Sequence, residues 1–142
     1  MTDWGDLDRE LEAWGRAGET ATLWWRDDDA VAPTPELDRL LEQAALVADR
    51  PLPLSLAVIP ARATSALAQR LAQCPHVAVL QHGYAHANHA PEAAKKMELG
   101  PHRPVASVLA ELQAGRQRLA DLFDGRVLPA LVPPWNRIDA AV

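Results

Sequence analysis

The sequence predicts an α/β fold built on a parallel β-sheet, and three observations support this prediction. Short apolar runs of strand length alternate with longer segments whose apolar residues recur at helical spacing. Such alternation is typical of parallel sheets with right-handed crossovers. Polar residues suited to chemistry follow the predicted strands, where the ligand sites of parallel sheets lie. Because 142 residues are enough for one hydrophobic core, we expect a single domain over residues 1–142.

The first third of the chain predicts two helices and one strand. Apolar residues at helical spacing over residues 7–14 predict a short amphipathic helix that packs on the outside of the domain. Residues 21–25 are rich in aromatic and β-branched types and predict a buried strand that stops at an acidic triplet. Thr34 is a candidate N-cap and Pro35 suits the first helical position, so a helix should follow with apolar residues in register over 37–48.

The remaining chain continues the alternation with one interruption. A polar and alanine-rich stretch over residues 83–104 predicts a long loop, and such loops inside compact domains are usually functional or mobile. We predict, in order, a strand at 54–59, a helix at 64–73, a strand at 77–80 that runs into His82, a helix at 105–123 and a strand at 127–132.

Composition argues against several partners. With 14 basic and 19 acidic residues, a formal charge of -5 and no cluster of Lys or Arg, the chain offers no footprint for nucleic acid or an anionic membrane. The amino terminus is acidic and lacks the pattern of a secretory signal, and no apolar run approaches about 18 residues. We therefore expect a soluble, cytoplasmic protein, with the single Cys74 in a structural role.

Two pairs of residues at predicted strand ends point to a divalent metal. Asp28 and Asp29 follow the first strand, and His82 and His86 follow the third. A catalytic zinc typically has three protein ligands and one open position for water, which one aspartate and two histidines can provide. Surface histidines without a metal, and a solvated acidic loop, are the alternative interpretations of the two pairs. An Mg²⁺-dependent phosphoester hydrolase is a weaker alternative, since it gives the histidines no role.

The acidic triplet also suggests a division of labour. Carboxylates buried side by side raise one another's pKa, and a bound cation relieves that conflict. If alternate side chains point in opposite directions, one aspartate can bind metal while its neighbour accepts a proton from the attacking water. Arg26 can orient one of these carboxylates, or it can be an ordinary surface arginine.

Three further residues are candidates for the surroundings of the site. Trp135 follows two prolines after the last strand and can present a flat apolar wall to a sugar ring, or it can pack in the core. Tyr84, between the two histidines, can line the pocket. His89 can be a third imidazole of the site or a plain polar loop residue.

The motifs resemble those of the polysaccharide deacetylases, the NodB-homology group of carbohydrate esterases. The residues that carry the resemblance occur in the family's order over nearly the whole chain: Arg26-Asp-Asp-Asp-Ala30, His82-Gly-Tyr-Ala-His86 and Val132-Pro-Pro-Trp-Asn136. The resemblance implies a (β/α) barrel of which only the first portion is present. It also implies a Zn²⁺ cofactor, with other divalent transition metals possible, and hydrolysis of the acetyl group from an N-acetylated sugar or a related non-peptide amide.

Carried over residue by residue, the resemblance makes Asp28 the catalytic base and Asp29, His82 and His86 the metal ligands. A register shifted by one would make Asp27 the base and Asp28 the ligand. Tyr84, Pro134, Trp135 and Asn136 would then bind substrate, and Arg26, Asp27 and His89 would surround the ligands.

Two departures from the family pattern limit what the resemblance implies. Val132 stands where the family often has an arginine that orients the base, a contact that Arg26 or Arg137 can replace. The family's late histidine, the general acid, has no counterpart before Val142, so we interpret the chain as the first half of a longer domain, a truncated product or a small relative that oligomerises. The alternative function is a non-catalytic metal- or carbohydrate-binding relative. A half barrel would leave open edges, so we also expect self-association.

Overall fold

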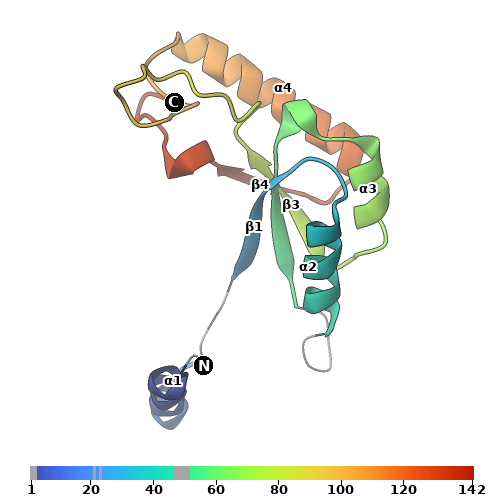
Figure 1. Ribbon diagram of the computed structural model, residues 1–142, viewed down its shortest axis with the longest axis vertical. Coiled ribbons are helices and arrows are strands. Elements are labelled where there is room, and N and C mark those ends of the chain that lie inside the picture. Colours follow the sequence, from blue (N-terminus) through green and yellow to red (C-terminus); the bar gives the residue numbers. More distant parts are fainter. Residues whose placement is uncertain (1–2, 21, 23, 47–51) are drawn as a thin grey trace.

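The computed structural model describes residues 3–20, 22, 24–46 and 52–142 (Figure 1). In chain order, its helices and strands are α1 (Gly5–Ala17), β1 (Trp25–Ala30), α2 (Pro35–Leu46), β2 (Leu54–Val58), the short 3-10 helix η1 (Pro60–Arg62), α3 (Ser65–Leu71), β3 (Val77–His82), α4 (Val105–Phe123), β4 (Val127–Val132) and the 3-10 helix η2 (Pro134–Asn136). Every helix and strand expected from the sequence is present.

The four strands form one parallel sheet in the order β1-β2-β3-β4. Chain order and spatial order coincide, so each crossover leads to the neighbouring strand. The predicted α/β fold with a parallel sheet is therefore confirmed. Because all strands run in the same direction, their carboxyl ends lie at the same end of the sheet, and the candidate site lies at this end.

The bounds predicted for the first strand were wrong. The strand begins at Trp25 and includes the acidic triplet, whereas residues 21 and 23 lie outside the described part of the chain. Aspartate has a low strand propensity, but Trp25 to Asp27 pair in register with Leu54 to Leu56 of the buried strand β2, and this pairing overrides the local preference. The ladder shifts between Asp27 and Ala30, which marks a β-bulge at the end of β1.

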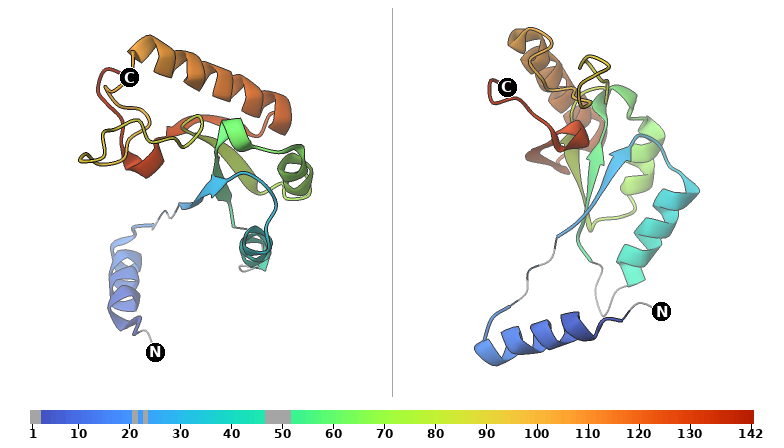
Figure 2. Two further views of the ribbon diagram at one scale, coloured as in Figure 1. Left: turned by 45° about the horizontal axis from the view of Figure 1, so that its top comes forward. Right: turned by 60° about the vertical axis from the view of Figure 1, so that its left-hand side comes forward.

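One face of the sheet carries the main hydrophobic core. Alternate residues of the strands point to this face, and α2, α3 and α4 all cover it (Figure 2). The principal buried residues of this core are Leu37, Leu41, Ala44, Leu54, Leu56, Val58, Leu67, Leu71, Cys74, Val77, Val79, Leu119 and Phe123. On the opposite face Ala57, Leu80 and Val132 form a smaller buried cluster. A parallel sheet flanked by these helices is compatible with a partial parallel α/β fold.

Local signals account for where the covering helices begin. The hydroxyl of Thr34 accepts a hydrogen bond from the backbone N–H of Leu37 at 3.1 Å, as an N-cap does at the start of α2. Thr64 plays the same role for α3, accepting from the N–H of Leu67 at 3.3 Å. The capping prediction at Thr34 is confirmed. These caps set the lengths of the loops that leave the carboxyl ends of β1 and β2.

The approach of α4 to the sheet depends on a glycine. A Cβ at Gly115 would lie 2.8 Å from Nε2 of Gln81 and 3.0 Å from Cγ of Pro60, so the two elements are too close for a side chain there. The same Gln81 amide donates to the carbonyl of Leu112 at 2.9 Å and to that of Gly83 at 3.0 Å. The end of β3 is thereby tied to α4.

The first helix stands apart from the sheet. None of the residues of α1 is buried, and its apolar residues Leu7, Leu11 and Trp14 are exposed (Figures 1 and 2). The expectation that this helix packs on the outside of the domain was wrong. Its amphipathic spacing predicts a helix, but spacing alone does not say which surface covers the apolar stripe.

Two further observations concern the sequence-based expectations about partners. No helix in the described parts of the chain has the length and apolarity needed to cross a bilayer. Strands β1 and β4 form the two edges of the sheet, and Leu128 and Leu131 of β4 are exposed. Self-association through such edges stays a prediction.

Candidate metal centre

Three candidate ligands meet above the carboxyl ends of β1 and β3. Oδ1 of Asp29 lies 3.2 Å from Nε2 of His82 and 3.2 Å from Nε2 of His86. One ligand atom from each of the three residues lies within 4.8 Å of the other two. Asp29 comes from the bulged end of β1, His82 ends β3 and His86 belongs to the following turn. We call these three residues the triad.

The position of one ring proton of His82 follows from its partner. Its ring is buried, and Nδ1 lies 2.9 Å from the backbone carbonyl oxygen of Val132. Because a carbonyl can only accept, Nδ1 must carry a proton and donate it, which leaves a lone pair on Nε2 in the neutral ring. That lone pair faces the Asp29 carboxylate. A neutral His82 therefore places two electron-pair donors 3.2 Å apart, an arrangement that a cation between them would stabilise.

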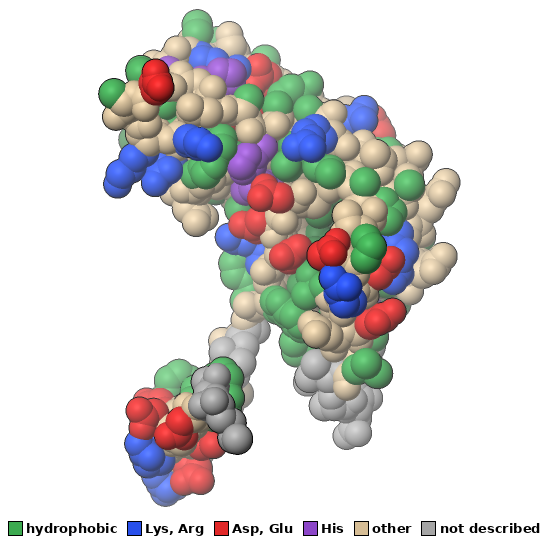
Figure 3. All heavy atoms as spheres, in the orientation of Figure 1, with side chains coloured by type: hydrophobic (Ala, Val, Ile, Leu, Met, Phe, Trp, Pro, Cys, Tyr) green, Lys and Arg blue, Asp and Glu red, His purple; other side chains and the backbone are tan. Residues whose placement is uncertain are grey.

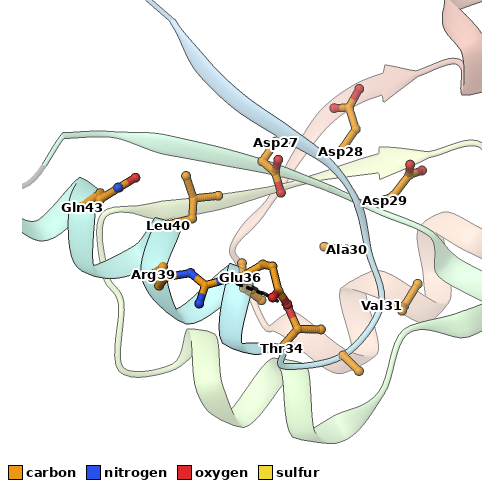
Figure 4. A pocket seen from close by; sticks show the side chains of 12 residues that line it. Asp27, Asp28, Asp29, Ala30, Val31, Thr34, Glu36, Arg39, Leu40 and Gln43 are labelled. Carbon is orange, nitrogen blue, oxygen red and sulfur yellow. Dashed lines mark hydrogen bonds and ion pairs between the residues drawn. The ribbon is translucent and has the colours of Figure 1, made fainter.

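The bulge in β1 turns Asp29 toward the histidines. In a regular strand Asp28 and Asp29 would point to opposite faces, with Asp27 on the same face as Asp29. Asp29 instead has a left-handed backbone with φ of 68°. The three aspartates consequently leave β1 in different directions (Figure 4). One motif therefore supplies carboxylates to different surroundings.

Asp28 lies on the face of β1 opposite α2 and pairs with Arg26. Nη2 of Arg26 donates to Oδ2 of Asp28 at 3.0 Å, and Nε lies 2.7 Å from Oδ1. The contact between Nε and Oδ1 is an ion pair without the geometry of a hydrogen bond, and Oδ1 is therefore buried without a hydrogen-bond partner. The guanidinium carbon of Arg26 also lies 5.3 Å from the centre of the Trp24 ring. The expectation that Arg26 pairs with a carboxylate of the triplet is confirmed.

Asp27 points to the other side of β1, toward α2 (Figure 4). Burial raises the pKa of its carboxyl above the usual 3.8, and the charges of Asp28 and Asp29 raise it further. This carboxyl lines a pocket of about 440 Å³ between β1 and α2. The residues that line the pocket are Asp27, Asp28, Asp29, Ala30, Val31, Ala32, Thr34, Glu36, Leu37, Arg39, Leu40 and Gln43.

Left-handed backbone conformations concentrate at the triad. Of the five non-glycine residues with positive φ in the described chain, four lie here: Asp29, His86, Trp135 and Asn136. Side chains disfavour this region of backbone space, and residues held in it cluster at functional sites. The sequence therefore folds into a conformation at this edge that local preferences alone would not choose.

The motif after β4 lies against the second histidine. The rings of Trp135 and His86 have centroids 4.3 Å apart, and Pro134 is buried beside Gly83. Trp135 is half-buried, and Asn136 is exposed. The structure thus brings two of the predicted substrate-binding residues next to the triad, with the Trp135 ring forming a wall beside His86.

Two other candidates have different surroundings from those expected. The backbone N–H of His89 donates to the carbonyl of Met97 at 3.0 Å. His89 is not among the ligand atoms that meet at the triad, which favours the plain loop residue over the third imidazole among the two interpretations of His89. Tyr84 is half-buried, and its carbonyl accepts from the N–H of Ala61 at 2.9 Å.

Sequence reasoning missed Glu98. This residue of the long loop is fully buried, and its carboxylate accepts hydrogen bonds from the backbone of the turn between the two histidines. Nothing in the sequence separates Glu98 from the exposed Glu92 nearby, since both stand in the same polar stretch. Only the packing of the loop distinguishes them.

The surface around the triad is charged on both sides. Histidine side chains at the centre of the view adjoin acidic side chains, and a lobe beside them carries several basic ones (Figure 3).

No protein family, curated protein or solved structure with which the chain was compared gives a significant match. The geometry of the triad and the sequence motifs are therefore the observations that bear on function.

Proposed function

We propose that this chain is a zinc-dependent hydrolase related to the polysaccharide deacetylases, which removes the acetyl group from an N-acetylated sugar or a related non-peptide amide. One observation carries the proposal: Asp29, His82 and His86 bring an oxygen and two ring nitrogens together, and Nδ1 of His82 faces the Val132 carbonyl, so that Nε2 is the ring nitrogen that faces the carboxylate. A cation makes these contacts favourable.

The donor set suits zinc. One carboxylate oxygen and two imidazole nitrogens are ligands that zinc takes in catalytic sites, where a further position stays open for water. Magnesium and calcium prefer oxygen ligands, so two imidazoles argue against them. The hydrogen bond from His82 to the Val132 carbonyl supports the fit, because metal-binding histidines usually donate their other ring N–H to an acceptor.

The fold supports the relation to deacetylases. The three motifs that carry the resemblance lie at the carboxyl ends of β1, β3 and β4, which are at the same end of the sheet. The helices that follow β1, β2 and β3 cover one face of the sheet. This is how a (β/α) barrel arranges its wall and its active site. We propose that the four strands form part of the wall of such a barrel.

The residues of the chain divide the work of amide hydrolysis. A bound zinc ion would lower the pKa of a water molecule toward about 7 and polarise the acetyl carbonyl. Asp28, next to the triad and oriented by Arg26, would accept the proton of the attacking water. Trp135 would exclude solvent on the side of His86 and contact the ring of the substrate.

Metal analysis of the purified chain tests the ligand assignment. We expect about one zinc ion per chain in the wild type and loss of most of it in D29A, H82A and H86A. The variant H89A is the matched control, because it removes a neighbouring histidine that does not reach the triad. A zinc content equal to that of the wild type in all three triad variants would contradict the proposal.

Acetate release tests the reaction. The intact chain with added Zn²⁺ is incubated with N-acetylated amino sugars and with simple N-acetyl amines, and free acetate is measured. Zinc-dependent release that D29A lacks supports a deacetylase. Zinc binding without turnover supports instead a non-catalytic metal- or carbohydrate-binding relative.

A further inference from the structure

Glu98 is a buried carboxylate that faces the backbone between two triad residues. It is fully buried in the long loop before α4. Its Oε1 accepts from the N–H of Ala85 at 2.7 Å, and its Oε2 accepts from the N–H of Tyr84 at 3.2 Å. A carboxylate is costly to bury unless hydrogen bonds compensate, and bonds to a charged acceptor are stronger than neutral ones. Both oxygens of Glu98 are used on this one turn.

The turn is shaped to receive that carboxylate. Gly83 has φ of 55°, and a Cβ there would overlap Oε2 of Glu98 and lie 2.6 Å from Cγ of Pro134. His86 follows with φ of 56°, also left-handed. A side chain at Gly83 would push the carboxylate away from the turn. The glycine and the glutamate therefore act together.

Glu98 itself is held in place on both sides. Before it, Oδ1 of Asn88 accepts from the N–H of Met97 at 2.9 Å. After it, the carbonyl of Leu99 accepts from the N–H of Asp139 at 2.8 Å. The carboxylate is thus presented by an anchored segment.

We propose that Glu98 is a positioning residue for the metal centre: through the amides of Tyr84 and Ala85 it sets the turn that places His86 opposite His82 and Asp29. Given the proposed metal site, Glu98 contributes to metal affinity without touching the metal. Residues that orient metal ligands typically change affinity by about 10- to 100-fold when replaced.

The first experiment compares E98Q with the wild type. In E98Q an NH₂ group replaces one oxygen and faces a backbone N–H, so one of the two hydrogen bonds is lost while the side-chain volume is kept. We expect the Kd for Zn²⁺ to rise at least about tenfold and the visible absorption spectrum of the Co²⁺ form, which reports ligand geometry, to change.

The matched control is E111Q. Glu111 is a half-buried carboxylate that anchors the same loop, through Arg103, but in the described chain it accepts no hydrogen bond from the turn. We expect E111Q to keep the wild-type Kd and Co²⁺ spectrum. An equal loss of affinity in E111Q and E98Q would assign the effect to general loosening of the loop and overturn the inference.

Two outcomes separate this inference from the proposed function. If the wild type binds zinc and E98Q binds it with the same Kd and spectrum, the role of Glu98 is wrong and the metal site stands. If the wild type binds no zinc, the proposed function fails. If E98Q does not fold, E98D keeps the charge but shortens the reach, and its zinc Kd should rise in the same direction.

Hydrogen exchange gives a readout that needs neither metal nor a variant. In the wild type, the amides of Tyr84 and Ala85 should exchange slowly compared with exposed loop amides, because both donate to a buried acceptor. Exchange of both amides at the rate of an unprotected loop would overturn the inference.

Discussion

Asp29 and His82 meet at 3.2 Å although strand β2 lies between their own strands in the sheet. The contact forms because the bulge at the end of β1 turns Asp29 across the end of β2. His82 is fixed in the other direction by its hydrogen bond to the carbonyl of Val132 in β4. The contact thus depends on β1, β3 and β4, and on the register shift at the end of β1.

Replacing the predicted base should separate metal binding from turnover. Asp28 lies beside the triad, but its oxygens contact Arg26 and not the histidines. We expect D28N to retain the wild-type zinc content and to lower kcat by about 10²- to 10⁴-fold, the usual contribution of a general base. Zinc content and acetate release measured on the same preparation check this. Zinc loss in D28N would assign Asp28 to the metal instead.

The neighbouring substitution decides between the two registers of the acidic pair. Asp27 points away from Asp28, toward α2. We expect D27N to keep kcat within about threefold of the wild type, because this carboxyl is not placed to take a proton at the triad. A loss in D27N as large as in D28N would favour the register in which Asp27 is the base.

Trp135 should act on substrate affinity more than on metal affinity. Its ring lies 4.3 Å from the ring of His86 and is half-buried, so it has a free face beside the triad. We expect W135A to raise KM about tenfold, with the zinc Kd and the melting temperature close to those of the wild type. A fall in melting temperature without any change in KM would instead identify Trp135 as a core residue.

The Arg103–Glu111 ion pair should make stability depend on pH. The two guanidinium nitrogens of Arg103 donate to the two carboxylate oxygens at 2.7 and 2.6 Å, and this pairing lowers the pKa of Glu111 below its usual 4.5. The stabilisation is therefore complete above pH 4.5 and is lost as the pH falls through the lowered pKa. Since Glu111 is one-third exposed, we expect E111Q to cost about 1 kcal/mol at pH 7.

Urea unfolding of the wild type and E111Q across acidic pH checks this prediction. The difference in the free energy of unfolding should be constant above about pH 6 and should shrink below the usual pKa of a glutamate. A difference that persists unchanged to pH 2 would contradict the assigned role of the ion pair.

Two glycine-to-alanine substitutions should have opposite effects. At Gly115 a Cβ would lie 2.8 Å from Nε2 of Gln81 and 3.0 Å from Pro60, so G115A should destabilise the protein by about 1 to 3 kcal/mol through overpacking. At Gly15 nothing lies within 4 Å, so G15A should raise the helicity of α1 by removing a residue that costs about 1 kcal/mol in a helix. Thermal unfolding and far-UV circular dichroism of both variants test this. Equal stability of G115A and wild type would contradict the close approach of α4.

Much of the fold could be predicted from the sequence, because its signals are local. Apolar periodicity located the helices and strands, and the alternation of the two indicated a parallel sheet. The exception was β1, whose bounds depend on pairing with β2. Its aspartates carry no strand signal of their own, and only the buried neighbour makes them extended. The position of α1 could not be predicted from local signals either, because an apolar stripe on a helix does not determine which surface it packs against.

By itself, the sequence determined the types of candidate ligand and their place at strand ends, because parallel strands bring their carboxyl ends to the same end of the sheet. Tertiary structure alone decided which aspartate faces the histidines, through a bulge and a left-handed residue that no residue pattern encodes. It also placed His89 outside the group of candidate ligand atoms and brought Glu98, which no residue pattern marks, against the turn between the two histidines. The physical reason is that residue types and their spacing determine local structure over a few residues. Backbone strain and burial are instead set by packing across the whole sheet.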